Sequence, residues 1–253
     1  MSLLFVSAAL ACWPAFACDL PDPVLTVPDT ADGTRVFVVA GHGNGTRTGN
    51  RGVYQQVESD VALDITLQLA GTLDALAAFD VTVGRQPGES PSYGTRLARL
   101  ERSGSVCLID VHTDSRPEFM YEWTDDSGTA VWRNDRQPGF AVLFNESGPL
   151  GPERRRLARA LARGLAGVGL PPYTLGYGEM YDADDVPGVY IDRRGLMMLR
   201  APEVPSVIVE THHALDVREA ARWREPETRQ AFAVGMANGL WSWIDGGSGA
   251  VGQ

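Results

Sequence analysis

The stretch from Arg35 to Leu69, RVFVVAGHGNGTRTGNRGVYQQVESDVALDITLQL, decides the class of fold that we expect. Residues 36–40 are apolar and mostly β-branched, which predicts a strand buried on both faces, as in a parallel sheet covered by helices. A polar, glycine-rich loop follows. From Glu58 onward, apolar residues recur every three or four positions, which predicts one face of a helix. A buried strand, a loop and an amphipathic helix are typical of an α/β protein.

The same alternation of elements continues along the chain. We therefore predict an α/β fold, a single domain with a mostly parallel twisted sheet and helices on both faces, and the 253 residues suffice for one sizeable core. The predicted strands are 80–85, 106–111, 140–144 and 207–209, with a hairpin over 121–133; the predicted helices are 95–102, 153–165 and 227–244, and 171–194 is expected to be a long functional loop.

Composition excludes one class of partner. The net charge of −10 and the pI near 4.9 lack the basic footprint that nucleic-acid binding requires. With 44% hydrophobic and 21% charged residues the chain resembles ordinary globular proteins. We expect a monomer with no transmembrane span in the mature chain.

The chain begins with an apolar run that ends in Ala15-Phe16-Ala17, which resembles a secretory signal peptide and its cleavage site. We predict a signal peptide over 1–17, a linker over 18–33, a catalytic domain over 34–245 and a flexible tail over 246–253. The protein is then exported, to the periplasm or outside the cell. A lipid anchor on Cys12 or Cys18 is left open, whereas Cys107 is expected to be a small core residue inside a strand.

Polar residues stand at the carboxyl ends of three predicted strands: His42, His112 and Glu210. Glu58 opens the helix after the first strand. In open α/β sheets ligands bind beyond these strand ends, and two imidazoles with a carboxylate suit a divalent metal. The alternative is structural: Glu58 would favour a helix N-terminus, and Glu210 would pair with an arginine such as Arg96.

Four short motifs resemble the zinc-dependent N-acetylmuramoyl-L-alanine amidases of bacterial cell-wall turnover. The family has a strand followed by Gly-His-Gly, a helix opening with Glu-x-Asp-Val-x-Leu, a strand ending in Ile-His-Ala-Asn and a closing Pro-Ala-Val-Leu-Val-Glu. Here these read Gly41-His42-Gly43, Glu58-Ser59-Asp60-Val61-Ala62-Leu63, Val111-His112-Thr113-Asp114 and Pro205-Ser206-Val207-Ile208-Val209-Glu210. The motifs occur in the family's order.

The resemblance implies that His42, Glu58 and His112 bind Zn²⁺ and that Glu210 is the catalytic acid/base. Three protein ligands leave a position open, as in catalytic zinc sites. The bond cut would join N-acetylmuramic acid to L-alanine in peptidoglycan or a muropeptide.

Three more residues are candidates for substrate binding. Arg96 looks like an arginine of the family that precedes the second-histidine strand, and Asp114 replaces the family's asparagine. His212 follows Glu210 where the family has a different continuation; it could orient the substrate, although we read His212 and His213 as polar rim residues.

Two other functions use the same residues. The first is a zinc peptidase of the carboxypeptidase type, since the same metal chemistry cuts any amide; the sixteen residues that separate His42 from Glu58 argue against it. The second is a non-catalytic wall-binding protein on the same fold, against which a retained Glu210 argues.

Overall fold

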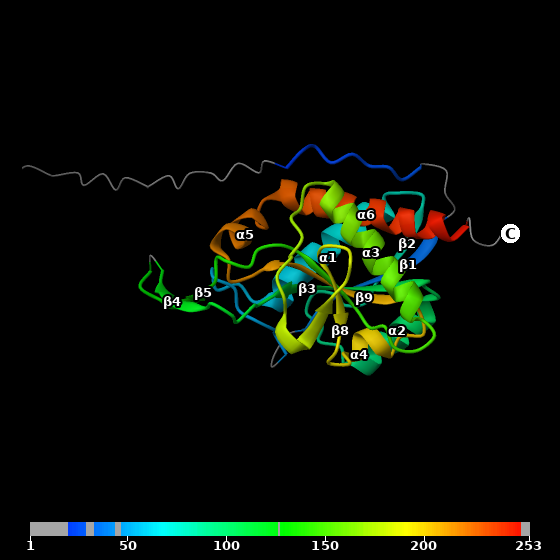
Figure 1. Cartoon of the computed structure of the whole chain (residues 1–253). Helices are drawn as coiled ribbons and strands as arrows, with labels where there is room; N and C mark the ends of the chain where they lie inside the picture. Colours follow the sequence, from blue (N-terminus) through cyan, green and yellow to red (C-terminus); the bar gives the residue numbers. More distant parts are fainter. Residues whose placement is uncertain (1–19, 29–32, 44–46, 126, 249–253) are drawn as a thin grey trace, which may run out of the picture.

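The fold is built on one central sheet of seven strands. Figure 1 shows the computed structural model, which describes residues 20–28, 33–43, 47–125 and 127–248. Across the sheet the strand order is β2-β1-β3-β9-β6-β8-β7, and β4 and β5 form a separate hairpin. The strands are β1 (Thr34–Ala40), β2 (Phe79–Val83), β3 (Cys107–Asp114), β4 (Tyr121–Thr124), β5 (Ala130–Arg133), β6 (Ala141–Phe144), β7 (Tyr181–Ala183), β8 (Val189–Asp192) and β9 (Ser206–His213). The helices are α1 (Glu58–Asp74), α2 (Tyr93–Ser103), α3 (Gly151–Gly167), η1 (Gly178–Met180), α4 (Met197–Arg200), α5 (Val217–Arg222) and α6 (Pro226–Ser248).

Most neighbouring strands run parallel, so the predicted α/β class is confirmed. β1 pairs with β2 and β3, and β3 pairs with β9, all in parallel. β6 runs antiparallel to β9, and β7 antiparallel to β8. The carboxyl ends of β1, β3 and β9 therefore meet at one edge of the sheet, where the candidate site lies.

Helices cover both faces of the sheet (Figure 1). α1, α3 and α6 pack on one face, where side chains such as Leu69, Leu161 and Phe232 form the main core. α2 and α4 cover part of the other face, with Leu100 and Met198 packed on it. This second cover is incomplete, because α4 has only four residues and the rest of that face is lined by tyrosines from the segment 173–190. The incomplete cover leaves room for a cavity.

Several predicted boundaries are wrong. His112 and Glu210 lie within β3 and β9 rather than after them, because both strands continue to Asp114 and His213. The segment 171–194 is not one loop, since it contains η1, β7 and β8. Apolar runs mark where a strand is buried on both faces, whereas hydrogen bonding extends further, into polar residues that line the site.

The N-terminal end of the described chain is hydrogen-bonded to α6, the C-terminal helix. Asn238 accepts hydrogen bonds from the amide and hydroxyl of Thr26 at 2.8 and 3.0 Å and donates to the carbonyl of Val24 at 2.8 Å. The predicted linker is thus attached to the domain over its described part. α6 reaches Ser248, so the predicted domain end at 245 falls inside a helix. The predicted signal peptide, Cys12 and Cys18 lie outside the described residues. Within the described residues, no helix has the length and apolarity that crossing a membrane needs.

Candidate active site

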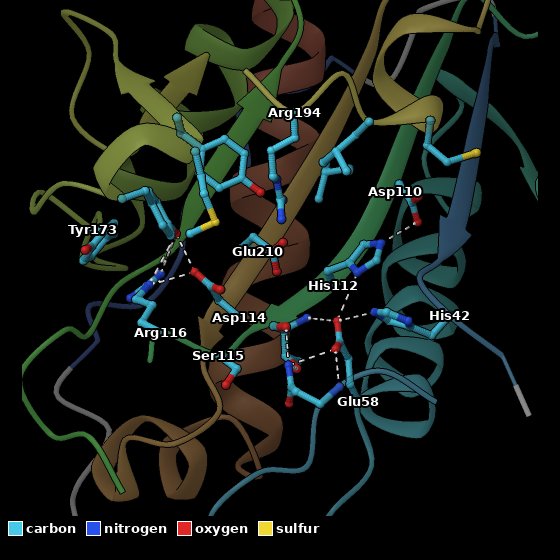
Figure 2. A pocket seen from close by; sticks show the side chains of 18 of the residues that line it. His42, Glu58, Asp110, His112, Asp114, Ser115, Arg116, Tyr173, Arg194 and Glu210 are labelled. Carbon is cyan, nitrogen blue, oxygen red and sulfur yellow. Dashed lines mark hydrogen bonds and ion pairs between the residues drawn. The ribbon is translucent and has the colours of Figure 1, made fainter. Parts of the chain in front are cut away.

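A cavity of about 630 Å³ lies over the carboxyl-terminal halves of β3 and β9 (Figure 2). Its lining includes all four residues predicted to carry the chemistry, together with Arg96 and Asp114. Side chains alternate along a strand, so Asp110 and His112 of β3 point to the same face of the sheet. That face is the one that α2 and α4 cover only in part.

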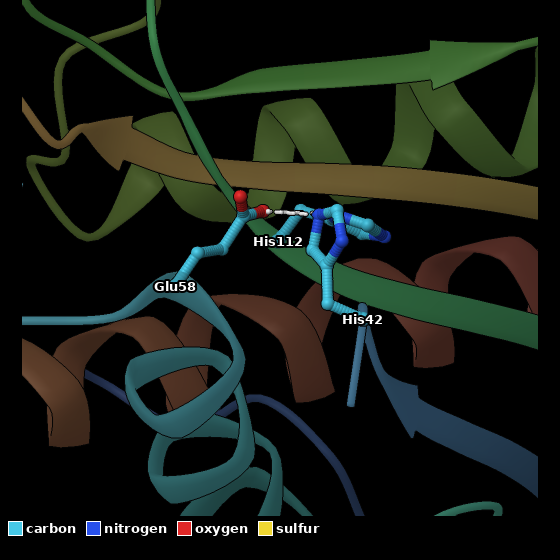
Figure 3. A group of neighbouring side chains, drawn as sticks. All are labelled: His42, Glu58 and His112. Carbon is cyan, nitrogen blue, oxygen red and sulfur yellow. Dashed lines mark hydrogen bonds and ion pairs between the residues drawn. The ribbon is translucent and has the colours of Figure 1, made fainter. Parts of the chain in front are cut away.

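His42, Glu58 and His112 converge at one wall of this cavity (Figure 3). One potential ligand atom from each lies within 4.8 Å of the others. Glu58 Oε1 lies 3.1 Å from His42 Nε2 and 3.0 Å from His112 Nδ1. Three residues from a loop, a helix and a strand thus meet at one point.

Backbone and amide donors fix the carboxylate of Glu58. The backbone and side-chain amides of Asn50 donate to its Oε2 at 2.9 and 2.8 Å, and the amide of Thr113 donates to its Oε1 at 3.2 Å. Burial alone would raise the pKa of Glu58, but hydrogen bonds from His112 and His42 outweigh burial and hold that pKa at about 2. Glu58 is therefore an ionised carboxylate in a fixed orientation. Sequence reasoning missed Asn50, whose loop gave no periodic signal.

Arg96 holds the loop that carries His42. His42 has a left-handed φ of 57°, which is uncommon for a residue with a side chain. The buried guanidinium of Arg96 donates to the carbonyl of Ala40 at 3.0 Å and to the carbonyl of His42. Arg96, which was predicted to bind substrate, also lines the cavity, and its hydrogen bonds support the backbone beneath a predicted ligand.

Asp110 orients His112 from the opposite side of the ring. Its Oδ1 lies 3.4 Å from His112 Nε2, while Nδ1 faces Glu58. Metal-binding histidines usually give their second nitrogen to a carboxylate in this way. Sequence reasoning missed Asp110, although an acidic residue two places before His112 in an apolar strand was a signal for it.

Glu210 stands beside this group on β9, where its backbone is in register with His112. Its Oε2 is buried and has no hydrogen-bond partner among the described residues. Burial raises the pKa of Glu210 to about 8, and the charge of Asp114 adds to this effect while that of His112 opposes it. A carboxyl group whose pKa lies near neutrality is suited to accept and release a proton. Among the described residues no ion pair joins Glu210 to Arg96. The alternative in which Glu210 is a structural carboxylate paired with Arg96 is therefore not supported.

Asp114 is tied into the far wall of the cavity. It accepts a hydrogen bond from Arg116 Nε at 2.8 Å and another from the hydroxyl of Tyr177. The guanidinium of Arg116 also lies 3.8 Å from the ring centroid of Tyr173. Neither Arg116 nor the tyrosines were singled out from the sequence, because they become neighbours only through the folding of 171–194.

His212 does not line this cavity, and its interpretation as a polar rim residue is wrong. Between the pairs His112–Glu210 and Asp114–His213, β9 advances three residues while β3 advances two. This bulge reverses the alternation of side chains. His212 is 2% exposed and stacks on Trp223 with ring centroids 5.0 Å apart, beside a second cavity. His213 is buried as well.

The donor set fits a divalent metal. Two imidazole nitrogens and one carboxylate oxygen are the ligands of catalytic zinc sites. Each is held from behind, by Arg96, by Asn50 or by Asp110, as metal ligands generally are.

Comparisons with known proteins agree with this geometry. A sequence model of the N-acetylmuramoyl-L-alanine amidases matches residues 36–242. Among solved structures, an amidase of Mycobacterium smegmatis has a TM-score of 0.67 at 19% identity, covering 85% of this chain and 99% of that one. One from Clostridium difficile 630 has a TM-score of 0.66 at 18% identity, covering 85% and 98%. One from Nostoc punctiforme has a TM-score of 0.62 at 19% identity, covering 85% and 99%. A search of the curated proteins returned no match. At these identities the solved structures show a common fold, and the sequence match carries the family.

Proposed function

This chain belongs to the N-acetylmuramoyl-L-alanine amidase family, and from that premise we propose that it is a zinc hydrolase of peptidoglycan. The bond cut is the amide between N-acetylmuramic acid and L-alanine. The observation that carries the proposal is the convergence of His42, Glu58 and His112 beside Glu210 in one cavity.

We assign the metal to His42 Nε2, Glu58 Oε1 and His112 Nδ1, the atoms that face one another. The chemistry that zinc supplies in such a site is Lewis-acid polarisation of the scissile carbonyl and activation of water near neutral pH. The chain's own contribution is to keep the three donors in place, with the carboxylate of Asp110 lying 3.4 Å from the second nitrogen of His112.

Glu210 is the proposed acid/base. As a carboxylate it removes a proton from the attacking water, and as an acid it returns that proton to the departing nitrogen of L-alanine. The products are a muramic carboxylic acid and a peptide with a free amino group. Burial favours the protonated form of Glu210, and opposite charge lowers a carboxyl pKa, so the carboxylate that the first step needs would be favoured if a dication were held by the three donors.

Export is part of the proposal, because peptidoglycan lies outside the cytoplasmic membrane. It rests on the predicted signal peptide over 1–17, and on the need of the enzyme to reach its substrate. A lipid anchor on Cys12 or Cys18 would be compatible with the same activity.

The test joins metal analysis to a substrate panel. Purified protein should contain one zinc per chain and release peptides from muropeptides while leaving ordinary peptides intact; cleavage of both would favour the peptidase alternative. Zinc binding with no hydrolysis of any muropeptide would favour the wall-binding alternative.

Two substitutions separate the proposed roles. Glu210→Gln should keep zinc and lower kcat by about 10²- to 10⁴-fold, the usual contribution of a general acid/base. His112→Ala should lose both zinc and activity. Glu219→Gln is the matched control, because Glu219 is a buried glutamate on α5 that does not line the cavity. Unchanged turnover in Glu210→Gln would show that another group is the base.

A further inference from the structure

The charged side chains that line the cavity differ in how far they are already hydrogen-bonded within the protein. Five acidic residues line it: Glu58, Asp110, Asp114, Glu118 and Glu210. Three arginines line it as well, and two of these are buried and use their donors inside the protein. Arg96 supports the loop of His42, and Arg116 donates to Asp114, Tyr177 and the carbonyls of Gln137 and Gly139.

Arg194 is the third cation, and its guanidinium is available. Its side chain is 44% exposed, and its nearest carboxylate, Asp192 Oδ1, lies 4.0 Å from Nε. Among the residues that the structure describes, its terminal nitrogens have no hydrogen-bond partner. Figure 2 shows the side chain directed into the cavity, on the side of Glu210 away from Glu58.

The groups around Arg194 orient its side chain, and they leave the terminal nitrogens of the guanidinium able to donate hydrogen bonds. The carboxylate of Asp192 accepts hydrogen bonds from the amides of Arg194 at 3.0 Å and Leu196 at 2.8 Å, which shapes the turn after β8. The guanidinium carbon lies 4.5 Å from the ring centroid of Tyr181. A guanidinium that rests on an aromatic ring keeps its planar edge free for bidentate binding of a carboxylate.

We propose that Arg194 is a substrate-binding residue that recognises a carboxylate of the peptide part of the substrate. The inference rests on the proposed amidase function, because a peptide joined through L-alanine carries a carboxylate at its end or on a side chain. Five acidic residues line the cavity, so an anionic substrate needs a cation that can bind it directly. Among the lining arginines of the described residues, Arg194 is the one whose terminal nitrogens have no hydrogen-bond partner. A sugar hydroxyl would use one donor and gain little from the charge.

The test compares two substrates of the same shape: N-acetylmuramoyl-L-alanyl-D-glutamate with free carboxylates, and its diamide. The wild type should show a KM for the carboxylate form about tenfold lower than for the diamide, as one charge-assisted bidentate contact predicts. In Arg194→Met this preference should fall to within twofold. Arg194→Lys, which keeps the charge and loses the fork, should retain part of the preference.

Arg193 provides the matched control. It is the adjacent residue, its side chain is likewise 44% exposed, and it pairs with Asp182 and Glu146 outside the cavity. Arg193→Met removes the same charge and should leave the preference intact. Equal losses in both variants would show a general electrostatic effect and overturn the assignment.

A binding measurement makes the result independent of turnover. In the Glu210→Gln background, calorimetric Kd values for the two uncleaved substrates should show the same preference and the same loss on Arg194→Met. A preference that survives Arg194→Met overturns the inference and leaves the amidase function standing. A wild type that neither cleaves nor binds either substrate overturns the proposed function and the inference with it.

Discussion

Replacing Gly41 by alanine should displace a predicted metal ligand while leaving the fold intact. A Cβ at this position would lie less than 3.0 Å from three atoms of the His112 ring, a spacing that real side chains do not show. The backbone does not move instead, because hydrogen bonds hold it. The amide of Gly41 donates to the carbonyl of Val111 at 2.8 Å, and Arg96 donates to the carbonyls of Ala40 and His42 on either side. The imidazole therefore has to move.

The size of the displacement sets the size of the effect. Comfortable contacts between heavy atoms begin near 3.5 Å, so the ring has to retreat by at least about 0.5 Å. Metal–ligand distances tolerate about 0.2 Å. Changes that only perturb a ligand's support cost about 10- to 100-fold in metal affinity. Displacing the ligand itself should therefore reach at least the upper end of that range, or about 2.7 kcal/mol.

The assay is zinc affinity by competition with a chelator, together with the melting temperature. Gly71→Ala is the control, because nothing lies within 4 Å of its added Cβ on the exposed side of α1, and alanine should raise helix stability by up to about 1 kcal/mol. We expect Gly41→Ala to lose zinc affinity and to stay folded. A Gly41→Ala protein that binds zinc within threefold of the wild type would refute the packing argument.

Two further predictions concern stability. Burial raises the pKa of Glu219 to about 7, so its protonated form stabilises the fold fully below the unfolded value of about 4.5, and this contribution is lost as pH rises through 7. Glu219 should contribute a loss of order 3 kcal/mol across that window, so the loss measured by denaturant unfolding should be smaller by that amount in Glu219→Gln than in the wild type. Equal pH dependence in both proteins would contradict it. Asn238→Ala removes three hydrogen bonds to the 20–28 segment, so amide exchange at Thr26 should quicken while exchange in β3 stays as it was.

The arrangement of the candidate site was predictable where it depends on parallel pairing alone. Strands that run in parallel end at one edge, so polar residues after separate apolar runs are brought together whatever the loops do. His42, His112 and Glu210 follow this rule, and the structure brings them together. Asp110 could have been found by the same reasoning, since alternation along β3 places it on the face of His112.

What the sequence did not reveal depends on register and on irregular segments. The bulge in β9 turns His212 away from the cavity, and no residue pattern marks it, because a bulge is defined by the partner strand. Arg116 contacts Tyr173 and Tyr177, which come from the aperiodic segment between α3 and η1. Such contacts between distant, aperiodic segments have no local signal.

The cavity has two walls of different origin, and this division has a functional consequence. The wall that holds His42, Glu58 and His112 is built by β1, β3 and α1, whose positions are fixed by the sheet and its core. The opposite wall, with Tyr177 and Arg194, comes from the part of the chain between α3 and α4, which includes the edge strands β7 and β8. The hydrogen bond of Tyr177 goes to Asp114, and none among the described residues joins Tyr177 or Arg194 to His42, Glu58 or His112. Substitutions in the second wall should therefore change which peptides are bound without changing zinc affinity. A loss of zinc in Arg194→Met would therefore contradict the separation of metal binding from substrate selection.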